Sequence, residues 1–420
     1  MDYIADLHIH SKYAGACSEQ LVLENLDKAA KTKGIGIIGT GDFTHPLWYR
    51  DLKEKLVEAE GRGLYRLKSG SAGTLFMATS EVCVIFGDSA TDNVKKIHNL
   101  IFAPSLDTVP QINEELARFG AAGGLSSDGR PILKMSNSDL VERLYKIDPS
   151  VVVTPAHIWT PWFGVLGTMG FNSFEEAYGD QARRIYALET GLSSDTLMNW
   201  RVSKLDKYVP ISAGDAHSLA KLGREATVFE MERPSYSEII SQIKEKRFKL
   251  NIEFYPEEGK YHFDGHRNCN VSLSPGEAKK YGSICPKCRR KLTIGVQHRV
   301  DDMADRPEGY MPKGHIPYVH AIPLREIIAY VTRKGEGTAY VNTLYQKLVQ
   351  EFGSEFNVLL YADMAKIAKV DAALAKSIEN VRAEHVRIIP GYDGVFGIID
   401  ILDLMHEEKK RGTQRQMSEF

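Results

Sequence analysis

The sequence predicts an α/β protein built on a parallel sheet or barrel, followed by two smaller parts of different character. Three observations predict this class. Short apolar runs rich in Val and Ile alternate with amphipathic segments up to about residue 252, a pattern typical of parallel α/β folds. His, Asp and Glu recur where those apolar runs end. Pro, Gly, His and Cys then crowd residues 255–297, and the chain becomes helical after Pro323.

The apolar runs have the length and composition of strands, and the segments between them have helical spacing. We expect strands at residues 3–8, 36–40, 75–86, 99–103, 151–155, 185–189, 209–213 and 226–229. We expect helices at residues 20–33, 47–60, 111–119, 138–147, 174–178 and 236–245, and later at 344–352, 364–370 and 370–383. In parallel α/β folds functional groups collect beyond the carboxyl ends of the strands, so polar residues there are candidate site residues.

Length and composition limit the number of domains and the classes of function that the chain can have. A chain of 420 residues is long for one domain. We expect an α/β catalytic domain over 1–255, a zinc-binding module over 256–322, a helical DNA-binding domain over 323–406 and a flexible tail over 407–420. The formal net charge is −2 and there are five cysteines, so nucleic-acid binding needs a local patch and a disulfide framework is not indicated. No apolar run approaches a membrane span, which predicts a cytoplasmic protein without a membrane partner.

The candidate metal ligands of the first domain are imidazoles and carboxylates at strand ends. His8 and His10 are spaced by two, which places both side chains on one face, and Asp215 and His217 repeat this spacing. The other candidates are Asp42, Glu81, His98 and His157. Such a set suits zinc, manganese or iron rather than calcium, and Glu81 has two oxygens with which to bridge two metals.

The alternative interpretation is structural, since a single buried His or Asp in an α/β domain is usually a satisfied core residue. For His98 alone this alternative is favoured, and Asp42 is intermediate. The two repeated pairs bracket the predicted domain and use the same position at a strand end. Their repetition favours a metal site.

The arrangement resembles the polymerase and histidinol phosphatase (PHP) superfamily, whose members begin with His-x-His on a strand and end with Asp-x-His. The resemblance covers roughly the first 250 residues. It implies a distorted seven-stranded α/β barrel with a two- or three-metal site, held by His8, His10, Glu81, His98, His157, Asp215 and His217. This chain departs from the family where Phe43 follows Asp42, in place of His, and where Cys17 stands in place of an acidic residue or His. Cys17 is either a further ligand or a small buried residue.

A second metal module is predicted from cysteine spacing. His266-x-x-Cys269 and Cys285-x-x-Cys288 have the two-knuckle pattern of a zinc ribbon or finger. Four protein ligands close the coordination sphere, so we expect one structural zinc. His262 and His298 remain alternatives to His266 as the fourth ligand.

Basic residues surround this module on an otherwise neutral chain. We expect DNA contacts from Lys287, Arg289, Arg290 and Lys291, whose charges would neutralise phosphates. The alternative is a solvated run of charge, which is the commoner meaning of such clusters. The neighbouring zinc module favours DNA.

Two or three divalent metals, such as zinc, manganese or magnesium, suit the hydrolysis of a phosphate ester. The sum of PHP-like domain, zinc module and helical domain resembles the endonuclease Q family along essentially the whole chain, including residues 6–13 and 390–394. This resemblance implies an enzyme that cuts damaged DNA on the 5′ side of deoxyuridine, deoxyinosine or an abasic site. The catalytic residues would then be His8, His10, Glu81, His157, Asp215 and His217.

Two further features bear on this interpretation. A damaged base must leave the helical stack to be read, and Trp159 and Trp162 follow His157 closely enough to line a base pocket, with core packing as the alternative. At the tail, Gln414-x-x-Met417-x-x-Phe420 resembles the box by which repair enzymes dock on the sliding clamp PCNA.

Two other functions stay open. A phosphomonoesterase of the histidinol-phosphatase type would need only the first domain. A non-catalytic DNA-binding adaptor would carry an empty metal site, and the near-complete ligand set argues against it.

Overall fold

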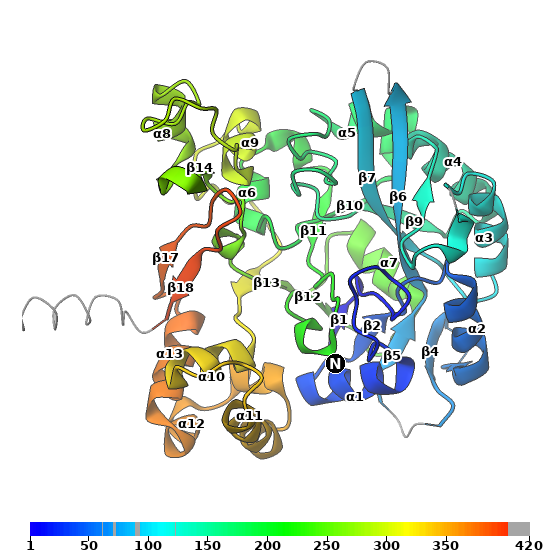
Figure 1. Cartoon of the computed structure of the whole chain (residues 1–420). Coiled ribbons are helices and arrows are strands. Elements are labelled where there is room, and N and C mark those ends of the chain that lie inside the picture. Colours follow the sequence, from blue (N-terminus) through cyan, green and yellow to red (C-terminus); the bar gives the residue numbers. More distant parts are fainter. Residues whose placement is uncertain (61, 70–72, 89–92, 122, 402–420) are drawn as a thin grey trace, which may run out of the picture.

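The molecule has the expected mixed α/β class (Figure 1). The computed structural model describes residues 1–60, 62–69, 73–88, 93–121 and 123–401. Most elements of the first 253 residues lie on one side of the molecule, and the predicted zinc module and the helical part lie one above the other on the opposite side.

The largest sheet has eight strands in the order β16-β13-β12-β1-β2-β5-β4-β3. In that order the strands are Tyr318–His320, Leu250–Glu253, Ala226–Glu230, Asp2–Asp6, Ile37–Gly39, Leu75–Met77, Leu64–Leu67 and Leu56–Glu58. Strands β1, β2 and β5 are parallel neighbours, whereas β12 is antiparallel to β1. The carboxyl ends of β1 and β2 therefore meet at one edge, where His8 and Asp42 follow.

Two smaller sheets complete the α/β part. A four-stranded sheet has the order β8-β6-β7-β9, and β10 pairs with β11 in parallel. These strands are Ile132–Leu133, Thr79–Asp88, Asn93–Phe102, Val152–Pro155, Ala187–Glu189 and Val209–Ile211. Among the described residues the strands thus divide into separate hydrogen-bonded sheets, and the closed seven-stranded barrel stays a prediction.

The strand expected over residues 75–86 is divided in two at Ala78. Thr40 donates a backbone hydrogen bond to Met77 (2.8 Å), whereas Ala103 donates one to Ala78 (2.9 Å). Strand β5 therefore belongs to the large sheet and β6 to the four-stranded sheet. This switch places Glu81, near the start of β6, beside the ends of β1 and β2.

Helices close to the expected positions cover the sheets. They are α1 (Leu23–Lys33), α2 (Pro46–Lys55), α3 (Val109–Ala117), α4 (Asn137–Ile147), α5 (Phe174–Tyr178) and α7 (Tyr236–Lys244). The short helix α6 (Thr196–Trp200) has no counterpart among the predicted helices. The helix expected over 47–60 ends at Lys55, because the next three residues pair as β3 with β4.

The end of β1 is tied to the loop that carries Asp215. The carboxylate of Asp6 accepts hydrogen bonds from Gly214 N (2.9 Å) and Gly223 N (2.7 Å). Ile9 forms a parallel bridge with Ala216. His8, expected as the last residue of the strand, therefore lies just beyond it, as His10 does. Both residues face the loop after β11.

The remaining chain forms two packed parts. The zinc module contains β14 (Asp264–His266), β15 (Val271–Leu273), α8 (Pro275–Lys280) and α9 (Val296–Met303). The helical part contains α10 (Leu324–Thr332), α11 (Ala339–Phe352), α12 (Met364–Val370), α13 (Ala372–Arg382) and a strand pair, β17 (Arg387–Ile389) with β18 (Ile398–Asp400). The segment before Pro323, expected in the zinc module, contributes β16 to the large sheet beside β13. The predicted domain limits otherwise stay a proposal.

Two further predictions concern the C-terminal tail and membrane-spanning helices. The clamp-binding residues Gln414, Met417 and Phe420 lie outside the described residues, so that expectation stays a prediction. Within the described residues, no helix combines the length and apolar character needed to cross a membrane.

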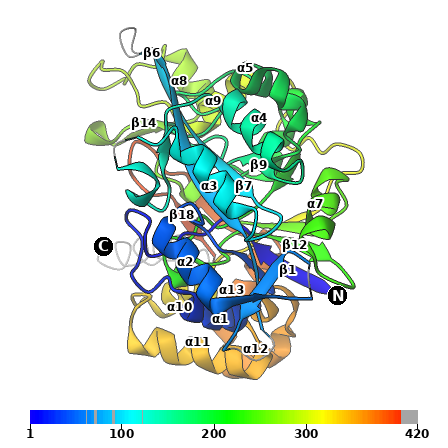
Figure 2. The same cartoon turned by 90° about the vertical axis from the view of Figure 1, so that its right-hand side faces the viewer.

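A buried ion pair joins the α/β part to the helical part. In Figure 2 helix α1 lies directly above α11, and Lys33 at the end of α1 contacts the Glu355 carboxylate at 3.1 Å with both side chains almost fully buried. Glu355 also accepts hydrogen bonds from Leu324 N (3.0 Å) and the Tyr345 hydroxyl (2.8 Å). One carboxylate thus ties three segments together.

Replacing Lys33 with Met leaves that carboxylate buried without its cation, which costs about 3–5 kcal/mol in comparable pairs. We expect the urea midpoint and the thermal midpoint to fall accordingly. Lys31→Met on the same helix is the control, because its pair with Asp27 is partly exposed and such pairs contribute less than about 1 kcal/mol. Equal losses in both variants would contradict the assignment.

Candidate metal centres

Four predicted ligands from three separate segments meet in one group. His8 and His10 follow β1, Glu81 lies in β6 and Asp215 follows β11. One donor atom from each of the four lies within 4.8 Å of the others. His10 Nε2 is 3.1 Å from Asp215 Oδ1 and 3.4 Å from Glu81 Oε2. His8 Nε2 is 3.4 Å from the same Asp215 oxygen. The group is the size of a metal coordination sphere.

A second group shares Glu81 with the first. It consists of Glu81, His98 and His157. Glu81 Oε1 is 2.7 Å from His98 Nδ1 and 3.1 Å from His157 Nε2. The two oxygens of one carboxylate therefore face two different sets of imidazoles, as a bridge between two metals requires.

The residues present fit divalent metals. His8 Nε2 is buried and has no hydrogen-bond partner, although it faces Glu81 and Asp215. A buried polar atom without a partner is costly, and here it points at carboxylates that would share a cation. Imidazole with carboxylate is a donor set for zinc or manganese.

Carboxylates outside the two groups hold the imidazole rings. His8 Nδ1 lies 2.9 Å from Glu189 Oε1, and His10 Nδ1 lies 2.9 Å from Asp42 Oδ1. Glu189 also accepts a hydrogen bond from His157 N (2.7 Å). Such partners fix the ring orientation and leave Nε2 for the metal. Direct ligation by Asp42 stays a prediction, since the structure places it on the far side of His10.

Sequence reasoning missed Glu189 and Arg130. Glu189 is the last residue of β10, so the rule that found the other candidates applies to it too. Arg130 Nη1 lies 3.1 Å from Glu81 Oε2, and no motif marked it. The guanidinium brings a positive charge to the edge of the centre.

Cys17 and His217, also predicted as ligands, lie outside both groups. His217 Nδ1 contacts the backbone oxygen of Asp215 at 2.8 Å, and its ring lies 4.7 Å from that of His10. Burial raises the pKa of the half-buried Cys17 thiol to about 11. Their metal-binding roles stay predictions.

Three site residues have left-handed backbone conformations. The φ angles are +47° at Asp42, +29° at His157 and +44° at Asp215. Non-glycine residues rarely adopt this region, which costs of order 1–3 kcal/mol each. The surrounding packing sustains this strain, and each of the three follows a strand end by two to four residues.

The charges of the centre are strongly coupled. Burial opposes protonation of His8, but Glu189, Asp215 and Glu81 outweigh it and raise its pKa well above the usual value. Burial likewise disfavours the Glu81 carboxylate, but His98 and His8 outweigh it and hold the pKa of Glu81 well below its ordinary range. Metals would take the place of these imidazole protons.

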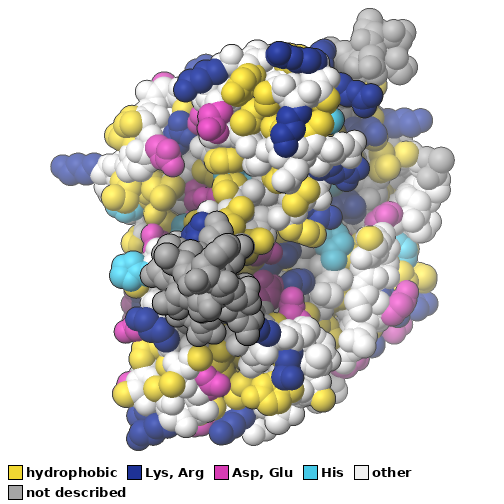
Figure 3. Space-filling view, turned by 60° about the vertical axis from the view of Figure 1, so that its left-hand side comes forward, with side chains coloured by type: hydrophobic (Ala, Val, Ile, Leu, Met, Phe, Trp, Pro, Cys, Tyr) yellow, Lys and Arg dark blue, Asp and Glu magenta, His cyan; other side chains and the backbone are white. Residues whose placement is uncertain are grey.

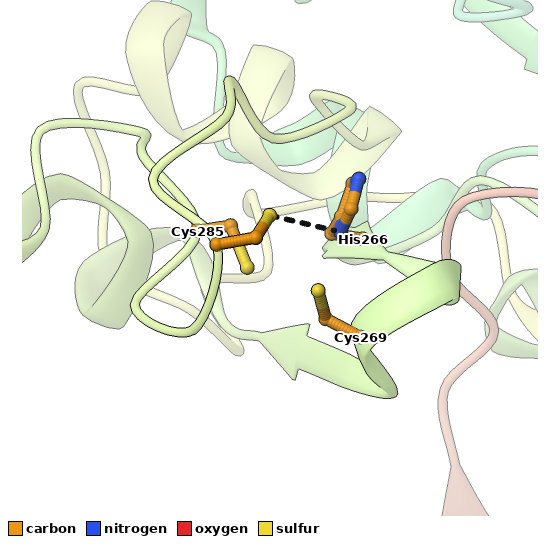
Figure 4. Close-up of side chains that lie close together, drawn as sticks. His266, Cys269 and Cys285 are labelled. Carbon is orange, nitrogen blue, oxygen red and sulfur yellow. Dashed lines mark hydrogen bonds between the residues drawn. The ribbon is translucent and has the colours of Figure 1, made fainter.

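The zinc-module ligands also converge. His266, Cys269, Cys285 and Cys288 have donor atoms within 4.8 Å of one another. In Figure 4, His266 and Cys269 approach from the end of β14 and the following turn, and Cys285 faces them from the later loop. The dashed contact joins His266 Nδ1 to Cys288 Sγ at 3.6 Å. Of the alternative fourth ligands, His298 contacts Asp264 instead (2.5 Å), and His262 lies outside the group.

The predicted DNA-contact residues Lys287, Arg289, Arg290 and Lys291 are all exposed. Lysine and arginine side chains gather at the top of the view in Figure 3, over the zinc module. A DNA-binding role for these four residues remains a proposal.

The two tryptophans predicted for a base pocket have different surroundings. Trp159 is 1% exposed and donates a hydrogen bond from Nε1 to Asn199 Oδ1 (2.8 Å), which agrees with the alternative of core packing. Trp162 is 49% exposed, with its ring 5.0 Å from that of Tyr261. Only Trp162 of the two is available to a ligand at the surface.

The fold and the site define a class of protein. It has an α/β part in which imidazoles surround a shared carboxylate as a candidate multi-metal centre, and it carries an attached Cys/His module. A family model described as the MJ0043 C-terminal domain matches residues 323–385. Uncharacterized protein MJ0043 of Methanocaldococcus jannaschii is 32% identical over 248 residues, which are 57% of this chain and 31% of MJ0043. The chain thus spans about a third of that relative's length.

Two solved structures are similar over almost the whole chain. The crystal structure of the lesion-specific endonuclease PfuEndoQ from Pyrococcus furiosus is 32% identical, with a TM-score of 0.85 over 95% of both chains. Endonuclease Q in complex with a 27-mer duplex substrate bearing an abasic lesion at the active site is 31% identical, with a TM-score of 0.83 over 95% of this chain and 96% of that one. The chain belongs to the endonuclease Q family.

The two ligand sets should be separable by metal analysis. We expect about three or four metals per purified chain. Cys285→Ser should remove the one zinc of the zinc module and leave the metals of the Glu81 centre bound. Glu81→Gln should lower the metal content of the Glu81 centre and leave the zinc of the module bound. Plasma mass spectrometry of each variant, with circular dichroism to check folding, measures this. Loss of all metals in either folded variant would contradict two independent sites.

Glu189→Gln tests the ring-holding role. Gln retains the size of Glu189 but loses the charge and one acceptor, so metal affinity at the shared centre should fall by about 10–100-fold. Competition with a chelator measures the affinity. Glu175→Gln is the control, since Glu175 is about half exposed and pairs with Lys207 at the surface. Unchanged affinity in Glu189→Gln would show that Glu189 does not orient the ligands.

Proposed function

We propose that the protein is a metal-dependent DNA repair endonuclease that cuts the phosphodiester on the 5′ side of deoxyuridine, deoxyinosine or an abasic nucleotide. Membership of the endonuclease Q family makes it an enzyme that cuts DNA, so the non-catalytic adaptor is set aside. The observation that carries the metal-dependent mechanism is the division of the two Glu81 oxygens between two groups of imidazoles. The similar complex with abasic duplex DNA supports the choice of lesion.

The proposed ligands are those of the two groups that share Glu81. They are His8, His10, Glu81 and Asp215 on one side, and Glu81, His98 and His157 on the other. Bound divalent metals supply Lewis-acid stabilisation of the phosphate and lower the pKa of a water molecule. Glu189 and Asp42 keep the rings of His8 and His10 aimed at the centre.

Other residues prepare the site for a phosphodiester. Arg130, with its side chain 26% exposed, places a guanidinium where an incoming phosphate meets the centre, and such a group pairs well with phosphate oxygens. The exposed cations of the zinc module would bind more distant phosphates of the same strand. A small phosphomonoester would use neither the zinc module nor its cations, which favours a polymeric substrate over the histidinol-phosphatase type of activity.

The test is cleavage of a duplex with one deoxyuridine, deoxyinosine or abasic site in the presence of Mg²⁺, Mn²⁺ or Zn²⁺. We expect a single nick on the 5′ side of the lesion and none in the undamaged duplex. His8→Ala and Asp215→Ala should each lower the cleavage rate by more than about 100-fold, beyond the loss seen for partners outside the coordination sphere.

Asp107→Ala is the matched control, because the Asp107 side chain is 83% exposed in the α/β part, where it pairs with Lys53. This variant should cut at the wild-type rate. Absence of a nick with every metal and every lesion would overturn the proposed function. Full activity in His8→Ala would instead overturn the assignment of the site.

A further inference from the structure

A strip of aromatic residues lies between the candidate metal centre and the β17–β18 hairpin. The Phe163 ring stacks on the His98 imidazole with centroids 4.6 Å apart. The preceding residue, Trp162, lies edge-on to Tyr261 at 5.0 Å. A side-chain carbon at Gly394 would lie 3.8 Å from the Tyr261 hydroxyl, so the loop between β17 and β18 lies directly against Tyr261.

That loop ends the strip with two exposed apolar side chains. Phe396 is 62% exposed and Val395 is 39% exposed. Lys260 Nζ lies 4.5 Å from the centre of the Phe396 ring. An aromatic ring left in water beside a cation is a feature of surfaces that contact bases and phosphates together.

The loop is held rigidly despite its exposed tip. Gly391 N donates to Glu257 O (2.8 Å), Gly394 N to Lys260 O (2.9 Å) and Gly397 N to Glu258 O (2.9 Å). These bonds dock both arms of the loop on residues 257–260, which follow β13. The loop is therefore fixed to the segment that links the α/β part to the zinc module (Figure 1).

Asp393 fastens the same loop to the zinc module itself. Its carboxylate accepts hydrogen bonds from Arg267 N (2.7 Å) and from the Thr293 hydroxyl (2.6 Å). Gly394 has a φ of +85°, and a side chain there would lie 3.1 Å from the Arg267 guanidinium. Glycine is needed for this turn, which presents Val395 and Phe396 outward.

We propose that Phe396 stacks against the base pairs next to the nucleotide that enters the metal centre, and that Trp162 contacts the DNA between them. The inference rests on the proposed function. A nucleotide that leaves the stack leaves a gap, and apolar side chains on rigid loops fill such gaps at a cost of partial unstacking. The cations beside the strip, Lys260 and the exposed Arg267, have the sign that a phosphate backbone requires.

The experiment compares Phe396→Ala with the wild-type protein on two substrates. One holds the deoxyuridine in a fully paired duplex, and the other holds it in an unpaired bubble. We expect kcat/KM of the variant to fall roughly tenfold or more on the paired duplex, with a much smaller loss on the bubble, because that DNA is already open. Phe396→Trp should restore cleavage of the paired duplex.

Tyr340→Ala is the matched control. Tyr340 is 53% exposed with Lys334 Nζ 5.3 Å from its ring centre, but it lies in the first turn of α11 and outside the strip. Because α11 belongs to the part predicted to bind DNA, the control is the ratio of the two rates, and Tyr340→Ala should change cleavage of the paired duplex and of the bubble by the same factor. A second readout is the fluorescence of 2-aminopurine placed next to the lesion, which should rise on binding to the wild-type protein and rise less with Phe396→Ala.

The outcomes separate the two proposals. If the wild-type protein cuts no lesion-bearing DNA, the proposed function fails. If the wild-type protein cuts the lesion-bearing DNA, the stacking role of Phe396 alone is overturned by either of two results. One is an unchanged kcat/KM in Phe396→Ala, and the other is an equal fall in kcat/KM on the paired duplex and on the bubble.

Discussion

The whole arrangement depends on one buried carboxylate. Glu81 is 1% exposed and lies among His8, His10, His98 and His157. A buried charge is tolerated only when opposite charge or a metal compensates it. Raised pKa values let His8, His10 and His157 supply this compensation by protonation, whereas burial lowers the pKa of His98 to about 4. Cations bound at the centre would replace the protons. With divalent metals bound, the centre would concentrate positive charge as the proposed cleavage of a phosphodiester requires.

The fold sustains this centre by tying strand ends to one another. Asp6 joins the end of β1 to the loop that carries Asp215, and the break at Ala78 moves the chain between sheets just before Glu81. Left-handed backbone at Asp42, His157 and Asp215 persists because packed neighbours leave no relaxed alternative. Strain and buried charge occur together here, as they do where a protein gives up local stability for a preorganised site.

The zinc module and the β17–β18 hairpin are joined to each other. The zinc module has a small core of its own, Val271, Ala278, Cys285 and Leu292. The predicted zinc would therefore supply much of its stability. The β17–β18 hairpin returns from the helical part and binds to this module through Asp393. The candidate metal centre, the zinc module and the hairpin are therefore connected through the aromatic strip, and a duplex bound in the proposed way would contact all three.

The sequence by itself determined the α/β class, most strand positions and the donor types, because these follow from hydrophobic periodicity and from spacings of two or three residues. It also predicted the four zinc-module donors that converge, since Cys-x-x-Cys pairs are local. Tertiary structure alone decided that Asp42 and Glu189 hold imidazole rings, that Trp159 is core while Trp162 is exposed, and that Gly394 meets Tyr261. The physical reason is that these contacts join segments far apart in the chain, and their pairing depends on which strands lie side by side, which no local pattern encodes.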